Sequence, residues 1–124
     1  MKKPVFPQND HERVNELLQL EILDTPSEEE FEDIVYMASS ITGCPMSLIS
    51  LVDNKRQWFK ARVGLNASET ERDISFCGHA ITSSNNGLFE VSDAHLDERF
   101  AENPLVTGNP NIRFYAGQPL VTST

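Results

Sequence analysis

The residues whose types could do chemistry gather in one short stretch, RDISFCGHAI at residues 72–81. The stretch sets a thiol, Cys77, two residues before an imidazole, His79, with Arg72 and Asp73 just upstream. A thiol next to an imidazole can form a nucleophile and base pair, and both groups are metal ligands. The stretch therefore fits a reaction centre, a metal site, a chromophore attachment point or a piece of scaffold.

The backbone beneath Cys77 and His79 decides between these interpretations. If residues 77–81 are helical, the two side chains differ by about 200° around the axis and point to nearly opposite sides, so they cannot pair or share a metal. A metal site also needs about four ligands, and the remaining histidines, His11 and His95, are isolated in the sequence. We therefore favour scaffold, and we expect no catalytic residue, no metal and no cofactor. A redox-sensing thiol at the helix start remains an alternative.

Length, charge and hydropathy exclude several classes of protein. A chain of 124 residues suits one domain around a single core. No apolar run approaches the ~20 residues that a membrane span needs, and prolines and polar residues interrupt residues 4–10, where a signal peptide would be apolar. The formal net charge of −9 repels phosphate backbones and anionic lipids. We therefore expect a cytoplasmic protein without nucleic-acid or membrane partners, in which Cys44 and Cys77 are reduced thiols.

Two helices are predicted to lead the chain. Apolar residues at helical spacing predict an amphipathic helix over residues 9–23 and a second helix that ends at Gly43. Thr25 with Glu28, or Ser27 with Glu30, can form a capping box at the start of the second helix. The apolar stripe that we expect this helix to bury consists of Phe31, Ile34, Val35, Ala38 and Ile41.

A β-hairpin is predicted to follow the helices. Residues 46–52 and 57–63 read as its strands, around a turn at residues 53–55, and residues 64–71 read as a polar loop. Trp58 and Phe59 are neighbours in the second strand, so we expect one to face inward and the other outward.

Short elements are predicted over the rest of the chain. A short helix lies within residues 76–84, and a turn at Asn85-Asn86-Gly87 leads into a strand at residues 88–91. Asp97 can cap a further short helix, and the last strand covers residues 112–121. A glycine and a proline inside that strand imply a bulge or an unpaired stretch. Helices, a hairpin and short helices between strands together predict an α+β fold with a mainly antiparallel sheet.

The chain resembles the GAF domain family, in the bacterial type that precedes histidine kinase or GGDEF diguanylate cyclase modules. The resemblance begins near Glu12 and rests on ILDTP at 22–26, SLVD at 50–53, RQWFK at 56–60, GL at 64–65, ET at 69–70, SFCGHAI at 75–81, DA at 93–94, Asp97 with RF at 99–100, NPLV at 103–106, RFYAG at 113–117 and PL at 119–120. It implies a single GAF-like domain over residues 1–124, related to profilin and PAS folds, with flanking helices. It also implies that the family's carboxy-terminal strands and closing helix lie outside these residues.

The resemblance implies a sensory or regulatory module of a bacterial signal-transduction protein, without catalysis of its own. Such a module binds a small-molecule ligand or signals through a dimer to a separate output domain. One alternative is a thiol-based redox enzyme or sensor of the GAF-type methionine sulfoxide reductase kind, which would use Cys44 and Cys77. Another is a bilin-binding photoreceptor, although its attachment cysteine is usually followed directly by histidine, whereas Gly78 intervenes here.

Aromatic and charged residues are the candidates for lining a ligand pocket. The set consists of Trp58, Arg72, Phe76, Cys77, His79, Asp93, Phe100, Arg113 and Tyr115. We expect Phe76, Phe100 and Tyr115, together with Phe114, to belong to the core. The charged members lie near a cavity or, equally well, form structural ion pairs and turn caps.

A homodimer or higher oligomer is also expected. If the family's last strands are missing, the strand at residues 46–52 has an unpaired apolar edge that can pair with another chain. The leading helix would likewise lack the closing helix, and exposed apolar faces mark association surfaces. The alternative is a monomer in which a loop or residues 4–7 fold over the edge.

Overall fold

The computed structural model describes residues 1–82 and 87–122, and these fall into two compact units. We call Asn9–Glu71 the hairpin unit, and Met1–Gln8 together with Arg72–Thr124 the aromatic unit. Both units combine helices with antiparallel strands, so the predicted α+β class is confirmed. The single domain over residues 1–124 stays a prediction.

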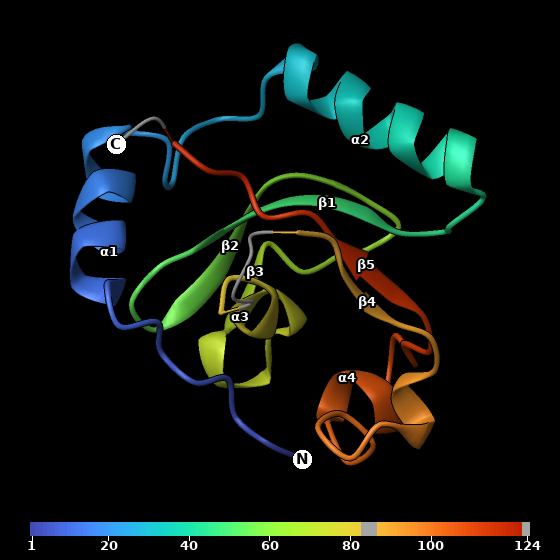
Figure 1. Cartoon of the computed structure of the whole chain (residues 1–124). Helices are drawn as coiled ribbons and strands as arrows, with labels where there is room; N and C mark the ends of the chain where they lie inside the picture. Colours follow the sequence, from blue (N-terminus) through green and yellow to red (C-terminus); the bar gives the residue numbers. More distant parts are fainter. Residues whose placement is uncertain (83–86, 123–124) are drawn as a thin grey trace. The chain divides into compact units, whose positions relative to one another are not determined.

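The hairpin unit is a three-stranded antiparallel sheet with α2 packed across β1 and β2 (Figure 1). The predicted hairpin is confirmed, but the loop expected at residues 64–71 contains a third strand that pairs with Arg56–Trp58. The first helix ends earlier than expected, because Glu21 and Asp24 take positive φ angles of 55° and 61°. The elements are α1 (Asp10–Gln19), α2 (Glu29–Thr42), β1 (Ser47–Val52), β2 (Arg56–Val63) and β3 (Glu69–Glu71).

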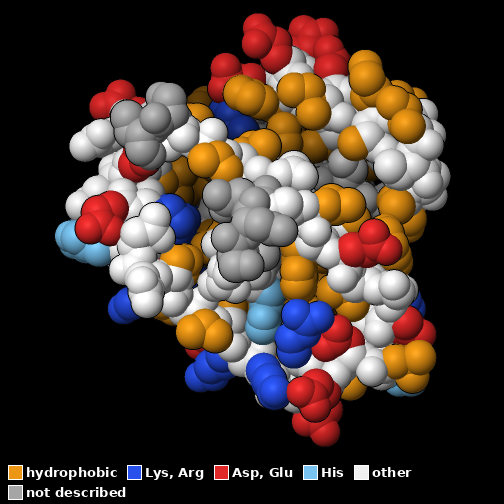
Figure 2. Space-filling view, in the orientation of Figure 1, with side chains coloured by type: hydrophobic (Ala, Val, Ile, Leu, Met, Phe, Trp, Pro, Cys, Tyr) orange, Lys and Arg blue, Asp and Glu red, His pale blue; other side chains and the backbone are white. Residues whose placement is uncertain are grey.

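The structure corrects which face of α2 is buried. Val35 is 1% exposed and lies between the partly buried Phe31 and Ser39 at i±4 spacing, and this stripe faces the sheet. Ile34, Ala38 and Ile41, which we expected in the core, are exposed, the last at 77%. Figure 2 shows hydrophobic side chains over α2 at the upper right of the molecule. The helix therefore carries a second apolar stripe, about 100° further round, that faces solvent.

The ends of α2 were predicted with mixed success. Gly43 stops the helix in the left-handed conformation, with φ 72°, as expected. Neither capping box forms, because the N-cap residue is Glu28 and its side chain makes no cap hydrogen bond. The Thr25 hydroxyl instead donates to the carbonyl oxygen of Ile22.

Trp58 and Phe59 are both buried, contrary to the expected inward and outward split. A β-bulge explains this, because Ile49 pairs with Ala61 while Ser50 pairs with Phe59. Lys60 is the extra residue, and the inside-outside alternation slips at that point. All residues from 57 to 61 are consequently buried.

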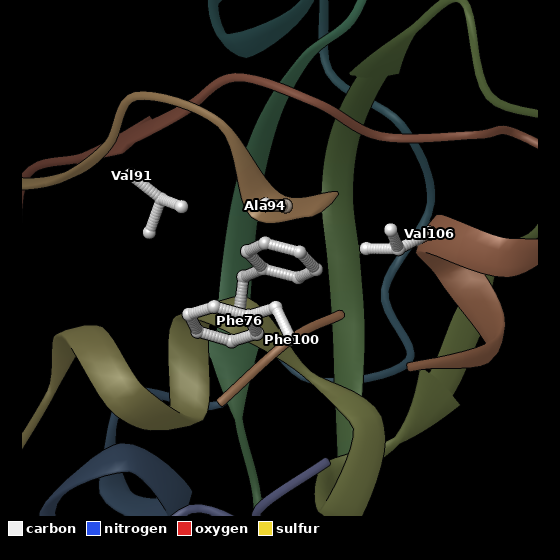
Figure 3. Packing of buried hydrophobic residues seen from close by; sticks show 5 residues of the cluster. All are labelled: Phe76, Val91, Ala94, Phe100 and Val106. Carbon is white, nitrogen blue, oxygen red and sulfur yellow. The ribbon is translucent and has the colours of Figure 1, made fainter. Parts of the chain in front are cut away.

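The aromatic unit consists of very short elements around a hydrophobic cluster. Figure 3 shows the cluster, which is made of Phe76, Val91, Ala94, Phe100 and Val106. The elements are η1 (Arg72–Ile74), α3 (Phe76–Ala80), β4 (Phe89–Val91), η2 (Ala94–Leu96), α4 (Pro104–Thr107) and β5 (Tyr115–Gly117), with β4 and β5 paired antiparallel.

Two expectations for this unit were wrong. Asp97 begins a hydrogen-bonded turn, in which its carbonyl oxygen accepts from the amides of Phe100 and Ala101, and not a helix. The last strand covers only β5, and its pairing stops at Gly117, where the glycine and proline had predicted an interruption. The short helix α3 and the strand β4 are confirmed. Asn85 and Asn86 of the predicted turn lie outside the described residues.

Candidate functional site

The stretch RDISFCGHAI folds as a 3-10 turn followed by a capped helix. The buried Ser75 links the two, because its hydroxyl donates to the carbonyl oxygen of Arg72 at 2.7 Å and accepts from the amide of Gly78 at 3.0 Å. This is the N-cap geometry that serine favours. The helical backbone therefore sends Cys77 and His79 in different directions.

Cys77 and His79 have separate partners. The Sγ of Cys77 lies 3.1 Å from the hydroxyl oxygen of Tyr115. The Nε2 of His79 lies 3.2 Å from the carbonyl oxygen of Lys2, to which it must donate. The geometry thus contains no nucleophile and base pair between the thiol and the imidazole.

Burial sets the protonation of the polar groups in this region. Burial, with a smaller contribution from Cys77, raises the pKa of the Tyr115 hydroxyl well above its usual range, so the phenol stays protonated. Burial also lowers the pKa of His79, although the hydrogen bond to Lys2 acts in the opposite direction. The imidazole is therefore neutral at neutral pH.

Stacked rings surround α3. The rings of Phe76 and Phe100 stack with centroids 4.2 Å apart, and Phe76 also contacts Tyr115 at 5.1 Å. The edge of His79 meets Phe100 at 4.7 Å. Figure 3 shows the two phenylalanine rings lying face to face. The cluster brings together, from the predicted pocket residues, Phe76, Cys77, His79, Phe100 and Tyr115.

Sequence reasoning missed Phe89 as a member of this cluster and predicted Phe114 wrongly. Phe89 lies edge-on to Phe100 and Tyr115, at 6.4 and 6.0 Å. Phe114, expected in the core, is half-exposed. In the antiparallel register Val91 faces Tyr115, and Phe89 lies two residues earlier in the same strand, on the same face. The strand period could have indicated Phe89, but only with the pairing partner known.

The charged candidates have structural partners. Arg72 is 2% exposed, and its guanidinium carbon lies 3.8 Å from the ring centroid of Phe6. Asp93 caps η2 by accepting from the amide of His95 at 3.0 Å. Arg113 donates to the carbonyl oxygens of Val106 and Ile112, each at 3.0 Å. Asp93 also borders an open groove of about 390 Å³ together with Glu90, Val91, Ser92, Leu96 and Asp97.

Trp58 belongs to the hairpin unit, where it borders a groove of about 410 Å³. The groove contains Lys60, whose side chain is only 1% exposed. Its Nζ donates to three oxygens at 2.7 Å, from the Thr25 hydroxyl, the Pro26 carbonyl and the Glu28 carboxylate. Sequence reasoning missed this lysine, although a charged residue inside an apolar strand signals a buried partner.

Arg56 binds the connection between α1 and α2, to which Lys60 also binds. Its guanidinium forms a bidentate pair with the Asp24 carboxylate at 2.8 and 2.6 Å, and also contacts Asp53 and Glu69. The hydrogen bond from Arg56 lowers the pKa of Asp24, and that to Asp24 raises the pKa of Arg56. Arg56 and Lys60 together fix residues 24–28 on β2, and we call this pair the β2 clamp.

Two further findings concern the described residues alone. Within residues 1–82 and 87–122, no group of three or more histidine, cysteine, aspartate or glutamate side chains is placed to hold a metal ion. Over the same residues, no helix is long and apolar enough to cross a membrane. Cys44 and Cys77 are reduced cysteines that are not joined in a disulfide, and they belong to different units.

Comparison with known proteins places most of the chain. Residues 26–123 match the GAF domain. A cyclic di-GMP phosphodiesterase of Pseudomonas aeruginosa is 46% identical over 123 residues, which cover 99% of this chain and 21% of the relative. The chain therefore spans about a fifth of the length of the relative it matches.

Proposed function

The chain belongs to the GAF domain family, and from this premise we propose that it is a regulatory module that has no catalysis of its own and acts on a separate output domain. The relative that shares 46% of its residues carries the name of a cyclic di-GMP phosphodiesterase, which supports a role in signal transduction. The output we propose is cyclic di-GMP turnover in the cytoplasm. A histidine kinase or diguanylate cyclase output stays a prediction.

The sensory site we propose is the aromatic cluster around α3. The observation that supports it is the meeting of Phe76, Phe100 and Tyr115 with two polar groups, the Cys77 thiol and the His79 imidazole. Ring faces and a few hydrogen-bonding groups are what a small, partly apolar ligand needs for recognition. Because Phe76 and Phe100 are already stacked in contact, a ligand must move a ring in order to bind, and that movement is the signal.

A second copy of the chain is the partner we propose for the exposed stripe of α2. Ile34, Met37 and Ile41 are all exposed there at i, i+3 and i+7 spacing. The charged residues of α2 lie in its first half, at Glu29 to Asp33. Antiparallel pairing about a two-fold axis keeps these acidic segments apart, whereas parallel pairing would set them side by side. Ile41→Asp should shift sedimentation toward the monomer, and a wild-type monomer at micromolar concentration would refute the dimer.

A domain exchange tests the regulatory role. This chain replaces the matching fifth of the Pseudomonas relative, and hydrolysis of cyclic di-GMP is measured. We expect the chimera to hydrolyse cyclic di-GMP, the isolated chain not to, and Phe76→Ala to change the rate of the chimera without abolishing it. Hydrolysis by the isolated chain would refute the absence of catalysis. A folded Phe76→Ala chimera with an unchanged rate would refute the site.

The two alternative functions have their own tests. If alkylation of Cys77 at neutral pH is no faster than that of an ordinary peptide thiol, the redox enzyme and redox sensor lose their basis. A photoreceptor would form a coloured covalent adduct with a bilin, and we expect none because Gly78 separates the cysteine from the histidine. Binding of any other ligand is measured by the melting temperature. A ligand concentration of 100 times the dissociation constant adds about 2.7 kcal/mol of stability.

A further inference from the structure

Residues 1–8 lie against α3 although they form no helix or strand. We propose that the surface formed by α3, η1 and residues 97–102, which we call the groove, recognises an extended, basic, proline-containing segment, and that residues 1–8 are its releasable occupant. We call these residues the strap. The inference goes beyond the regulatory role above, because it requires neither a ligand nor an output domain.

Pro4 is the anchor of the strap, and Gly78 makes room for it. Pro4 is buried, while every other strap residue except the partly buried Pro7 is exposed. A Cβ added at Gly78 would come within 2.6 Å of the Oγ of Ser75 and within 2.7 Å of the Cγ of Pro4, both closer than such atoms approach. The glycine that separates Cys77 from His79 in the sequence therefore makes room for the serine cap and for Pro4, and it forms the floor of the groove.

The backbone of Lys2 is recognised on both sides. Its amide donates to the carbonyl oxygen of Arg99 at 3.0 Å, and its carbonyl oxygen accepts from the Nε2 of His79 at 3.2 Å. Bonds to both main-chain groups of one residue fix an extended segment in register without reading its side chain, as in β-strand addition. His79 thus acts in peptide recognition, a role that a thiol and imidazole motif did not suggest.

Phe6 supplies a second side-chain contact. Its ring lies over Arg72, with 3.8 Å between the guanidinium carbon and the ring centroid. The nearly buried guanidinium and the ring form a cation–π pair, in which the ring itself is 53% exposed. The spacing of Pro4 and Phe6 places both side chains on one side of an extended backbone, and Val5 between them is 74% exposed.

Charges complete the match between strap and groove. Lys2 pairs with Glu98 at 2.9 Å, Lys3 with Asp73 at 3.5 Å, and the terminal ammonium group with Glu102 at 3.5 Å. Each positive group of the strap therefore meets a carboxylate of the aromatic unit. Most of these groups are exposed, so the pairs direct the basic segment to the groove more than they hold it there.

The same contacts explain why the strap can be released. One buried side chain, one cation–π pair and a few exposed ion pairs must offset the entropy of ordering residues 1–8. Segments held by so few buried contacts open far more readily than a core does. A segment of the same chemistry on another protein can therefore compete for the groove.

Peptide binding in trans tests the proposal. The probe is a synthetic peptide of residues 1–8 with a fluorophore at its carboxyl end, and fluorescence anisotropy reports its binding. We expect only weak binding to the full wild-type chain, because the tethered strap competes at a millimolar effective concentration. The full chain with Pro4→Ala should bind the peptide about tenfold more tightly than the wild type, the factor for losing two buried methylene groups. Val5→Ala, the matched control at an exposed position, should behave as the wild type.

A second arm uses the chain without residues 1–8, with circular dichroism as the check of folding. The folded shortened chain should bind the peptide, and a Pro4→Ala peptide should bind about tenfold more weakly. A folded shortened chain that leaves the anisotropy unchanged, or that binds the two peptides equally, overturns the proposal. If the shortened chain does not fold, the full-chain variants decide alone, and equal binding by Pro4→Ala and Val5→Ala is the overturning result.

Discussion

Different kinds of interaction stabilise the hairpin unit and the aromatic unit, each within itself. In the hairpin unit, strands of six and eight residues and a helix of 14 residues carry the structure, and cations of β2 tie a loop to them. In the aromatic unit the regular elements have three to five residues, and stacked rings organise them.

This difference predicts which substitutions will lower the stability most. Long elements with a period of their own keep their form when one contact is lost, since each residue adds to the same ladder or helix. Short elements have little stability alone, so those of the aromatic unit depend on the rings they share. We therefore expect the largest losses from ring deletions and the smallest from changes to exposed charges.

Deleting the central ring should have the largest effect. Phe100 is fully buried and contacts Phe76, His79 and Phe89, so Phe100→Ala should lower the free energy of unfolding by about 3–5 kcal/mol. Urea unfolding measures the loss. Hydrogen exchange should rise more in residues 72–122 than in residues 9–71. Equal rises in the two ranges would show that the units open together, and would contradict the claim that ring deletions act mainly on the aromatic unit.

Phe114→Ala is the matched control for that ring. The side chain is half-exposed, and no ring contact is recorded for it among the described residues. Its deletion should lower the stability by less than about 1 kcal/mol. A loss as large as that of Phe100→Ala would mean that size alone, and not stacking, determines the effect.

The sequence predicted the hairpin unit better than the aromatic unit for the same physical reason. The strands near residues 46–52 and 57–63 and the stop at Gly43 depend on local periods and on a local backbone preference. The helix expected at Asp97 became a turn, and the strand expected at residues 112–121 shrank to β5, because these segments take their form from rings far along the chain.

The sequence predicted which residues belong to the candidate site better than it predicted their contacts. Aromatic residue type was enough to indicate that Phe76, Phe100 and Tyr115 would be core residues. That Cys77 meets Tyr115, that His79 meets Lys2 and that Lys60 meets Thr25 could not be read from spacing, since the partners lie 35 to 77 residues apart. The stripe predicted on α2 was right for Phe31 and Val35 and wrong for Ile34 and Ile41, because two apolar stripes compete for one sheet.

Lys60→Met should have the next largest effect, and it probes the hairpin unit. The change removes the donors of the Thr25 hydroxyl and the Pro26 carbonyl, while the exposed Glu28 can hydrate. We expect a loss of about 1–3 kcal/mol in urea unfolding and faster hydrogen exchange in residues 20–28. Lys55→Met, at an exposed position, should stay within about 0.5 kcal/mol of the wild type. A more stable Lys60→Met chain would show that apolar packing outperforms the clamp.

Acidification should weaken the aromatic unit through His79. Burial lowers the pKa of this imidazole below its usual 6.5, so the unfolded chain binds the proton more readily than the folded chain. Stability should therefore fall as the pH drops through about 6.5 and level off below the lowered pKa of the folded state. Melting temperatures between pH 8 and pH 5 measure this slope.

Replacing single histidines with glutamine shows which residue causes this pH dependence of stability. His79→Gln should flatten it, whereas His11→Gln, at an exposed position on α1, should leave it unchanged. Asp97 and Asp24 do not interfere, because their pKa values are lowered from 3.8 and their contributions are lost only at still lower pH. An undiminished slope in His79→Gln would assign the pH dependence to another group.

Arg56→Lys should have the smallest effect. Lysine cannot form the bidentate pair with Asp24, but that carboxylate is 63% exposed, so solvent screens most of what is lost. We expect a loss of at most about 1 kcal/mol, and smaller still in high salt. Arg62→Lys, an exposed arginine of the same strand, is the control.

The double variant Arg56→Lys with Lys60→Met sharpens the comparison further. Both cations hold the same connection between α1 and α2, with Arg56 on Asp24 and Lys60 on Thr25. When one of these interactions is lost, residues 24–28 move more freely, and the remaining interaction then stabilises the fold less. The stability losses of the two single variants should therefore sum to more than the loss of the double variant. Additive losses would mean that the connection is already rigid without its cations. In that case strands and helices alone would order the hairpin unit, and Arg56 and Lys60 would contribute independently of each other.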